Sequence, residues 1–122
     1  MSEIASNLIQ IRHQIDLSCQ GCERDPQTVR LLAVSKKKPS QTIIDAFNAG
    51  QTLFGESYVQ EFTQKSEELE LPIEWHFIGG LQSNKVKYLR GKTALIHSVD
   101  RYSLAREISA QWGKIGKTAD IL

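Results

Sequence analysis

The feature that most constrains the fold of this chain is a strict alternation of short apolar runs with longer amphipathic segments. The apolar runs predict β-strands at residues 29–35, 51–54, 73–78 and 93–98, and a further strand begins at 120. The amphipathic segments predict helices at 4–17, 40–48, 56–70 and 101–113, with a short helix at 84–89. Strands and helices that alternate in this way form an α/β fold with a parallel sheet and right-handed crossovers.

The spacing of these units favours a parallel (β/α) barrel of the TIM type over an open doubly wound sheet. The strands begin roughly 21 residues apart, and eight such βα units close a barrel in about 250 residues. The 122 residues hold an N-terminal helix, four βα units and the start of a fifth strand. They therefore predict about half of such a barrel, as a single domain over 1–122. An open sheet would carry a G-x-G-x-x-G turn after its first strand, and none follows this one.

Composition and charge exclude two classes of partner. Fifteen Lys and Arg against fourteen Asp and Glu leave a net charge of +1, so no basic field attracts nucleic acid. The longest aliphatic run, Leu31–Val34, is far shorter than the about 20 residues that span a bilayer. The N-terminal segment is amphipathic and has no apolar signal core. We therefore expect a cytoplasmic protein that binds neither nucleic acid nor a membrane.

Cys19 and Cys22 form a C-x-x-C pair. A redox pair of the thioredoxin type would follow a strand and open a helix, whereas this pair follows the first predicted helix. A zinc site would need two more ligands, and no H-x-x-x-H or carboxylate cluster supplies them. We interpret the two cysteines as reduced thiols in a loop and predict no metal site.

Polar segments stand where each predicted strand ends. They cover residues 35–39, 55–58, 76–85 and 97–101. Because ligands of parallel α/β folds bind at the carboxyl ends of the strands, these segments predict a binding site.

Lys36 is the candidate nucleophile of that site. Strand alternation places it on the same side as Val34, at the end of a row that we expect to face the core. Lys37 and Lys38 follow directly, and like charge together with partial burial favours the neutral amine, which attacks aldehydes. The residues alone leave open a solvated lysine run, which is the interpretation we give to Lys37 and Lys38.

His76 and His97 are ambiguous by the same reasoning. His76 alternates with Trp75 and Phe77, so it faces away from those two rings. It could reach a ligand at the strand end, or it could be a buried histidine with its hydrogen bonds satisfied. No pair of carboxylates is placed for acid–base chemistry, so we predict no catalytic residue.

Four motifs at these strand ends carry a resemblance to a known family. They read L-A-V-S-K at 32–36, F-G-E-S-Y-V-Q-E at 54–61, W-H-F-I-G-G-L-Q-S-N-K at 75–85 and I-H-S-V-D-R at 96–101. With them, the sequence resembles the pyridoxal phosphate homeostasis proteins, single-domain relatives of the alanine racemase barrel. The likeness runs from about residue 28 to the end of the chain.

The resemblance implies a protein that binds pyridoxal 5′-phosphate (PLP) and acts in intracellular PLP homeostasis as a carrier or regulator. It implies a Schiff base between the cofactor and Lys36, with His76 and Ser98 lining the pocket. Ser57 stands where the family usually has an asparagine near the cofactor. A hydroxyl offers one donor where the amide offers two, so this contact departs from the family pattern.

Two other functions stay open from the sequence. A PLP-dependent amino-acid racemase would need a second acid–base group opposite the lysine, which the racemase relatives take from a separate β domain. An inactive half-barrel that only associates with other chains is the third alternative. The expected partners are PLP, and beyond it PLP-dependent enzymes or a C-terminal half of the same fold.

The length of the chain adds a further expectation. Family members are about twice as long and close a full barrel, and their later loops hold the cofactor phosphate. We expect the 122 residues alone to expose an apolar inner face and an unpaired strand edge. Such a chain should self-associate or capture a complementary half, and it should hold PLP weakly.

Overall fold

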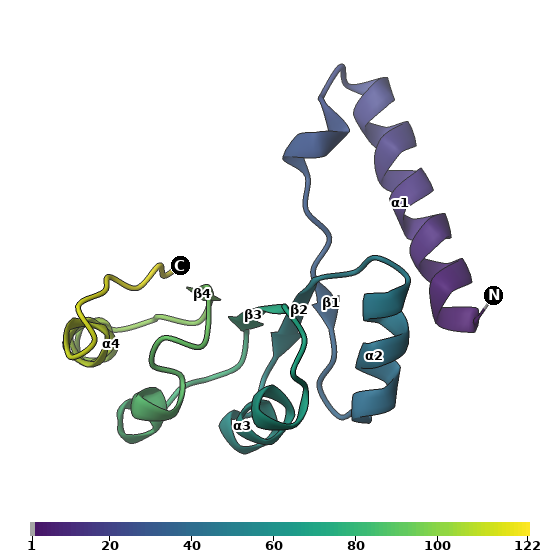
Figure 1. Ribbon diagram of the computed structural model, residues 1–122. Coiled ribbons are helices and arrows are strands. Elements are labelled where there is room, and N and C mark those ends of the chain that lie inside the picture. The colour runs from purple at the N-terminus through teal and green to yellow at the C-terminus, as the bar shows by residue number, and fades with distance from the viewer. Residues whose placement is uncertain (1) are drawn as a thin grey trace.

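The computed structural model describes residues 2–122, which form a four-stranded parallel sheet flanked by helices (Figure 1). The elements in chain order are α1 (Glu3–Gly21), the 3₁₀ helix η1 (Pro26–Thr28), β1 (Ala33–Val34), α2 (Ser40–Asn48), β2 (Leu53–Glu56), α3 (Val59–Glu68), β3 (Glu74–Phe77), the 3₁₀ helix η2 (Ser83–Tyr88), β4 (Leu95–Ile96) and α4 (Tyr102–Gly113). The predicted α/β architecture is confirmed.

The strands lie in the order β1-β2-β3-β4, and every neighbouring pair is parallel. One row of paired residues crosses the whole sheet, through Val34, Gly55, His76 and Leu95. Beyond β4, Ile121 forms a single parallel bridge with Ile96, where the sequence predicts the start of a fifth strand.

The helices α2, α3 and α4 lie in an arc along one side of the row of strands (Figure 1). Packing between the two layers is centred on Trp75 of β3. Its ring centroid is 6.1 Å from that of Phe54 in β2 and 5.7 Å from that of Phe62 in α3. Because side chains alternate along a strand, the row that starts at Val34 faces the other side of the sheet. Figure 1 shows none of the helices of residues 2–122 over β2, β3 and β4 on that side, which we call the open face.

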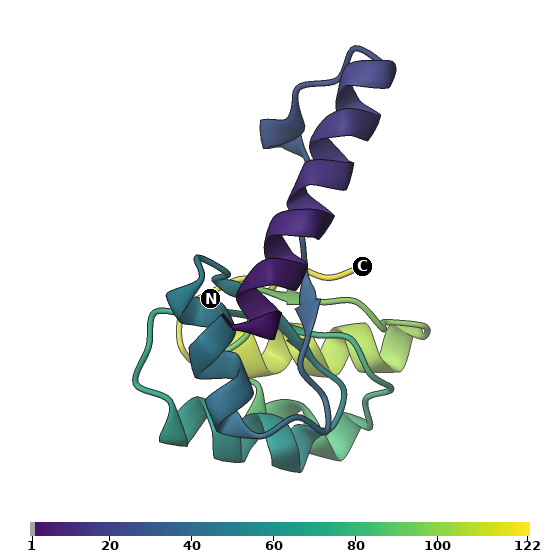
Figure 2. The same cartoon turned by 90° about the vertical axis from the view of Figure 1, so that its right-hand side faces the viewer.

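The helix α1 packs against α2 and projects away from the sheet (Figure 2). It runs about one turn further than the sequence predicts, to Gly21. Cys19 is therefore buried inside the helix, and only Cys22 lies beyond its end, exposed as expected. Both thiols are free. Within residues 2–122, no helix combines the length and the apolar character needed to cross a membrane.

The first strand is much shorter than predicted, two residues instead of the seven at 29–35. Just before β1, a side chain replaces the backbone pairing of a strand. The Gln51 Nε2 donates to the carbonyl oxygens of Leu31 (2.7 Å) and Leu53 (2.8 Å). Val34 is 51% exposed, so the expectation that the row of Val34 and Lys36 faces the core is wrong for the described residues. Its side chain lies on the open face.

Asp100 precedes the helix predicted at 101–113, where an aspartate can serve as the N-cap, but it does not cap α4. The helix begins at Tyr102, and no side chain of residues 2–122 caps it. The Asp100 carboxylate instead accepts a hydrogen bond from the guanidinium of Arg101 at 2.7 Å. The short helix predicted at 84–89 is present as the 3₁₀ helix η2.

Gly79 allows the ends of β2 and β3 to approach each other closely. A Cβ atom on this residue would lie 2.1 Å from the carbonyl oxygen of Ser57 and 2.7 Å from its carbonyl carbon. Backbone atoms cannot swing aside as a side-chain tip can. The geometry of this edge therefore requires glycine at position 79, whereas a Cβ on Gly80 would meet nothing within 4 Å.

Replacing Gly79 by alanine should lower the free energy of unfolding by about 1–3 kcal/mol, the usual range for overpacking. Gly80→Ala is the matched control, because the same methyl group enters open space there. Urea unfolding followed by circular dichroism measures both changes. Equal stability of the two variants would contradict the assigned close contact.

Candidate functional site

The carboxyl edge of the sheet brings Lys36 and Ser57 to the ends of neighbouring strands. The Ser35 N–H donates to the carbonyl oxygen of Gly55 at 3.0 Å, so pairing continues one residue beyond β1. Lys36 follows directly, and Ser57 directly follows β2. The sequence prediction that these two residues share one edge is consistent with this register.

Lys36 is exposed, and its side chain makes no hydrogen bond or ion pair within residues 2–122. The expected partial burial is therefore wrong. The lysine lies in the turn directly after β1, two residues beyond Val34 on the open face, which none of the described helices covers. Lys37 differs from it, because its Nζ lies 5.7 Å from the ring centroid of Tyr58. The amine of Lys36 is thus free to meet a small molecule at the edge.

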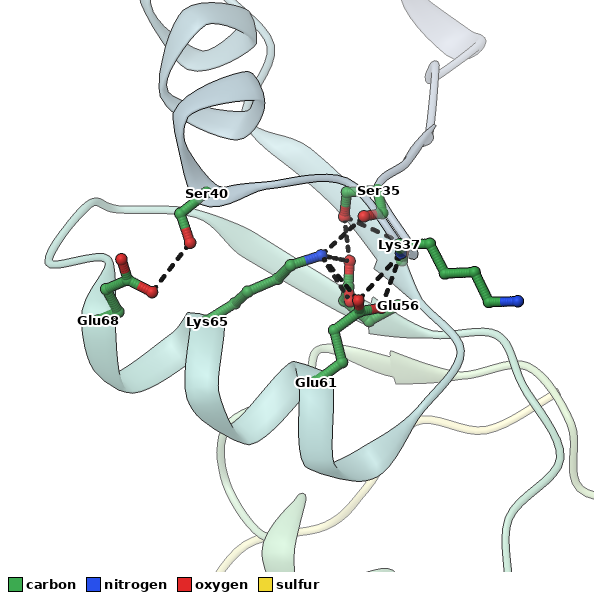
Figure 3. A network of polar contacts seen from close by, with 8 residues as sticks. Ser35, Lys37, Ser40, Glu56, Glu61, Lys65 and Glu68 are labelled. Carbon is green, nitrogen blue, oxygen red and sulfur yellow. Dashed lines mark hydrogen bonds and ion pairs between the residues drawn. The ribbon is translucent and has the colours of Figure 1, made fainter.

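A buried ionic cluster lies directly beneath the turn that carries Lys36 (Figure 3). It consists of Ser35, Glu56, Glu61 and Lys65, and we call it the Glu56 cluster. The Lys65 Nζ donates to the carbonyl oxygen of Ser35 at 2.7 Å and to Glu56 Oε1 and Oε2 at 3.2 and 3.1 Å. It also lies 3.6 Å from Glu61 Oε2, and the Ser35 hydroxyl donates to the Glu56 carboxylate. Glu56 is fully buried and Lys65 is 5% exposed.

The Glu56 cluster was not predicted from the sequence. The helical periodicity of residues 56–70 puts Ser66 on the same stripe as Phe62 and Leu69, whereas in the structure Lys65 is buried and Ser66 only half-buried. The sequence does contain a pattern that could have indicated the cluster. Lys65 follows Phe62 by three residues on the same face of the helix, and the strand before this helix ends in Glu56. A carboxylate on the helix-covered face of a sheet needs such a cation.

The pKa values of the two carboxyl groups of the cluster are shifted in opposite directions. Burial raises the pKa of Glu56, although hydrogen bonds from Ser35 and Lys65 act against it. Burial would also raise the pKa of Glu61, but the Lys37 N–H and the neighbouring groups, Lys65 among them, outweigh it and bring this pKa below the ordinary value. Both Glu61 oxygens accept from that N–H, at 2.9 and 3.0 Å.

A second polar network crosses the open face and contains His76. Its Nδ1 lies 2.9 Å from Nε2 of His97, and its Nε2 lies 3.0 Å from Oε2 of Glu74. Arg30 holds Glu74 from the other side with two hydrogen bonds of 3.0 and 2.9 Å. Both ring nitrogens of His76 are therefore occupied, and its ring is held in one orientation. The structure brings His76 together with His97 rather than with Lys36, because β2 lies between β1 and β3.

This network also shifts two pKa values. The hydrogen bonds from Arg30, and to a smaller extent from His76, lower the pKa of Glu74 against the effect of burial. Burial, with a contribution from the charge of His76, lowers the pKa of His97. His97 is therefore neutral over more of the neutral range than an ordinary histidine.

Ser98, the last predicted site residue, is half-buried just beyond β4. Its hydroxyl oxygen is buried and has no hydrogen-bond partner among residues 2–122. Buried hydroxyl groups are normally paired, so an unpaired one is a position where a polar group of a ligand can bind.

A groove of about 1090 Å³ lies between α3 and η2. Ser57 and Gly80 are among its lining residues, whereas Lys36, His76 and Ser98 are not. The groove therefore reaches the carboxyl edge at Ser57 but does not include Lys36. No group of three or more His, Cys, Asp or Glu side chains in the described part of the chain is arranged to hold a metal ion.

Comparison with known proteins identifies homologues over nearly the whole chain. The chain is 44% identical over 116 residues to the pyridoxal phosphate homeostasis protein of Aquifex aeolicus, which covers 94% of this chain and 51% of that protein. It is 46% identical over 112 residues to the protein of the same name from Pseudomonas aeruginosa, covering 91% and 49%. The chain is a homologue of these proteins. It spans about half the length of the curated relatives it matches, and no family model matches it.

Solved structures with the same fold cover 98% of the chain. PipY of Synechococcus elongatus PCC7942, solved with PLP bound, has a TM-score of 0.84 and 36% identity, and the match covers 52% of PipY. The crystal structure of a protein from Bifidobacterium adolescentis has a TM-score of 0.89 and 31% identity, with 53% of that protein covered.

The second network makes a prediction about stability in acid. Since the pKa of Glu74 is lower in the folded chain, the unfolded chain binds more protons as the pH falls through that range, so the network loses its stabilising effect. Glu74→Gln should therefore lower the melting temperature near pH 7 and reduce its further fall as the pH drops below about 5. The effect should stay below about 1 kcal/mol, because Arg30 and Glu74 are partly exposed.

The control for this measurement is Glu70→Gln, at an exposed glutamate that makes no ion pair within residues 2–122. It should leave the pH profile of the melting temperature unchanged. Identical profiles for Glu74→Gln and the unmodified chain would contradict the role assigned to the Arg30–Glu74 pair.

Proposed function

We propose that this chain binds PLP through a Schiff base on Lys36 and that the protein acts in PLP homeostasis as a carrier or regulator. The observation that carries the proposal is the free, exposed amine of Lys36 at the carboxyl edge of a parallel sheet. In the proposed reaction the neutral amine adds to the aldehyde carbon, a C=N bond forms and one water molecule leaves. The reverse reaction with water releases the cofactor, as a carrier requires.

The residues at this edge fit an aldehyde-bearing ligand. Lys36 has no competing partner within residues 2–122, whereas Lys37 lies against Tyr58. Ser57 follows the neighbouring strand, and the unpaired hydroxyl of Ser98 supplies a donor beyond β4. His76, held by Glu74 and His97, would form a fixed polar wall on the open face.

The comparisons support the same function. The curated homologues are named pyridoxal phosphate homeostasis proteins, and PipY was solved with PLP bound. Both matches include the four strands and the segment with Lys36, since 91% or more of this chain is covered.

We also propose that the sheet is the first part of a (β/α) barrel. Its strand order follows the chain without reversal, and α2, α3 and α4 lie on one side of it. A doubly wound sheet would reverse its strand order at a switch point and place helices on both faces. A sequential parallel sheet with helices outside is the arrangement that continues into a barrel.

The proposed partners follow from the open face. Val34, Ile121 and Leu122 are exposed next to the outer strands and offer apolar surface to the remaining strands of a barrel or to a second copy of the chain. PLP-dependent enzymes are the proposed recipients of the cofactor. The cytoplasmic location inferred from composition stays a prediction.

Lys36→Ala should abolish the adduct that borohydride fixes when the chain is incubated with PLP. The reason is that reduction of the C=N bond makes the link permanent only at the lysine that formed it. Absorbance of the reduced pyridoxyl group and peptide mapping by mass spectrometry measure the loss.

The matched controls are Lys37→Ala and Lys38→Ala, which remove the adjacent amines of the same run and should leave the adduct in place. An adduct that maps to Lys37 as often as to Lys36 would overturn the assignment of the nucleophile.

Ser57→Asn should tighten PLP binding, because it supplies the second donor that the homologous position usually offers. The expected gain is that of one hydrogen bond, about 0.5–1.5 kcal/mol. Titration of the aldehyde absorbance measures it, with Ser57→Ala as the companion variant. If neither substitution changes the affinity, the Ser57 side chain does not contact the cofactor.

A further inference from the structure

The backbone on both sides of Lys36 is fastened to the same helix. On the N-terminal side, Lys65 of α3 donates to the carbonyl oxygen of Ser35 at 2.7 Å. On the C-terminal side, Glu61 of α3 accepts from the Lys37 N–H with both carboxylate oxygens, at 2.9 and 3.0 Å. Figure 3 shows Lys65 and Glu61 reaching the turn from successive turns of this helix. Lys36 is therefore the middle residue of a clamped tripeptide.

The turn needs this support because its conformation is strained. Lys37 has a φ of +60°, a left-handed conformation that residues with a Cβ seldom adopt. Within the turn itself, the Lys38 N–H donates to the carbonyl oxygen of Ser35 at 3.2 Å. The bifurcated bond to Glu61 is shorter and charge-assisted, so it contributes more to holding Lys37 in place.

Stability alone does not account for the ionic character of the cluster. Burying Lys65 beside Glu56 costs desolvation, and apolar side chains of the same volume are often at least as stabilising. What an apolar pair cannot supply is directed bonds to the Ser35 carbonyl and the Lys37 amide. The charged groups of the cluster thus hold the backbone of the turn in its conformation.

We propose that the Glu56 cluster positions Lys36 for reaction with an aldehyde, with Lys65 and Glu61 as the positioning residues. The Lys36 side chain makes no hydrogen bond or ion pair within residues 2–122 that would set its direction, so the backbone at 35–37 sets it. This inference deepens the proposed function and rests on it. It predicts that reactivity is concentrated on Lys36 instead of being shared along the lysine run.

The test compares variants of the clamp with variants outside it. Lys65→Met removes the bond to Ser35, and Glu61→Ala removes the bond to Lys37. Each should slow formation of the reducible PLP adduct at Lys36 about tenfold, since small displacements of a reacting group cost this much or more. Each should also spread the label toward Lys37 and Lys38. Glu61→Gln keeps one acceptor oxygen and should restore part of the rate and of the selectivity.

Two controls separate positioning from general loss of stability. Glu68→Gln alters the same helix outside the cluster, where the carboxylate accepts from the Ser40 hydroxyl at 3.0 Å, and should leave rate and selectivity unchanged. Ile108→Val weakens the buried core at α4, far along the chain from the turn, and lowers the melting temperature without touching the clamp. It should therefore keep the label on Lys36.

Two further readouts do not require PLP. Hydrogen exchange of the Lys37 amide should be accelerated in Glu61→Ala, because that amide loses its acceptor. Reductive methylation with formaldehyde should modify Lys36 faster than Lys38 in the unmodified chain, and this difference should disappear in both clamp variants.

The outcomes distinguish the two proposals. If the unmodified chain gives no PLP adduct at Lys36 but the amide-exchange and methylation differences are present, the PLP function fails and the positioning role stands. If Glu61→Ala folds and keeps the rate, the selectivity and the amide protection of the unmodified chain, the positioning role is overturned. Lys65 is buried, so Glu61→Ala decides the question if Lys65→Met does not fold.

Discussion

The packing of Phe54 and Trp75 against Phe62 determines which side of the sheet faces the helices. Once these rings occupy the covered side, strand alternation sends the row of Val34 to the opposite side. Lys36 follows in the turn directly after this strand. The aromatic contacts therefore set the side on which the last strand residue before the candidate nucleophile lies, although none of the three rings is near it in the sequence.

Each face of the sheet carries one polar network, and the two networks hold different parts of the structure in place. On the covered face, the buried Glu56 is neutralised by Lys65 and joined to the backbone of the turn after β1. On the open face, His76 is saturated by Glu74 and His97. The first network holds the turn at Lys37 in a strained conformation. The second fixes the orientation of the His76 ring, whose backbone is already held in β3. Together they fix polar groups on two sides of the edge where parallel sheets bind ligands.

The order of the elements and the edge that carries Lys36 followed from local pattern, because apolar periodicity reports which residues face a core. The extent of β1 did not, because the side chain of Gln51, distant in sequence, pairs with the backbone before it. Nor did the Lys65–Glu56 pair, since a lysine in a helix reads as a solvated residue until a buried carboxylate is placed opposite. The His76–His97 contact depends on how β3 pairs with β4, and register between strands is a tertiary property.

The contact between His76 and His97 limits the number of hydrogens that the two facing ring nitrogens can carry. The Nε2 atom of His76 faces a carboxylate and therefore carries a hydrogen, so the 2.9 Å gap between the two rings must hold a single proton shared by Nδ1 and the facing Nε2. If His76 is neutral, that proton belongs to His97; if His76 is an imidazolium, it donates the proton and His97 is neutral with its remaining hydrogen on Nδ1. Two imidazolium rings would point two donors at each other across this gap. This contact therefore holds one hydrogen only, and the ring that carries it decides whether the outer nitrogen of His97 is an acceptor or a donor.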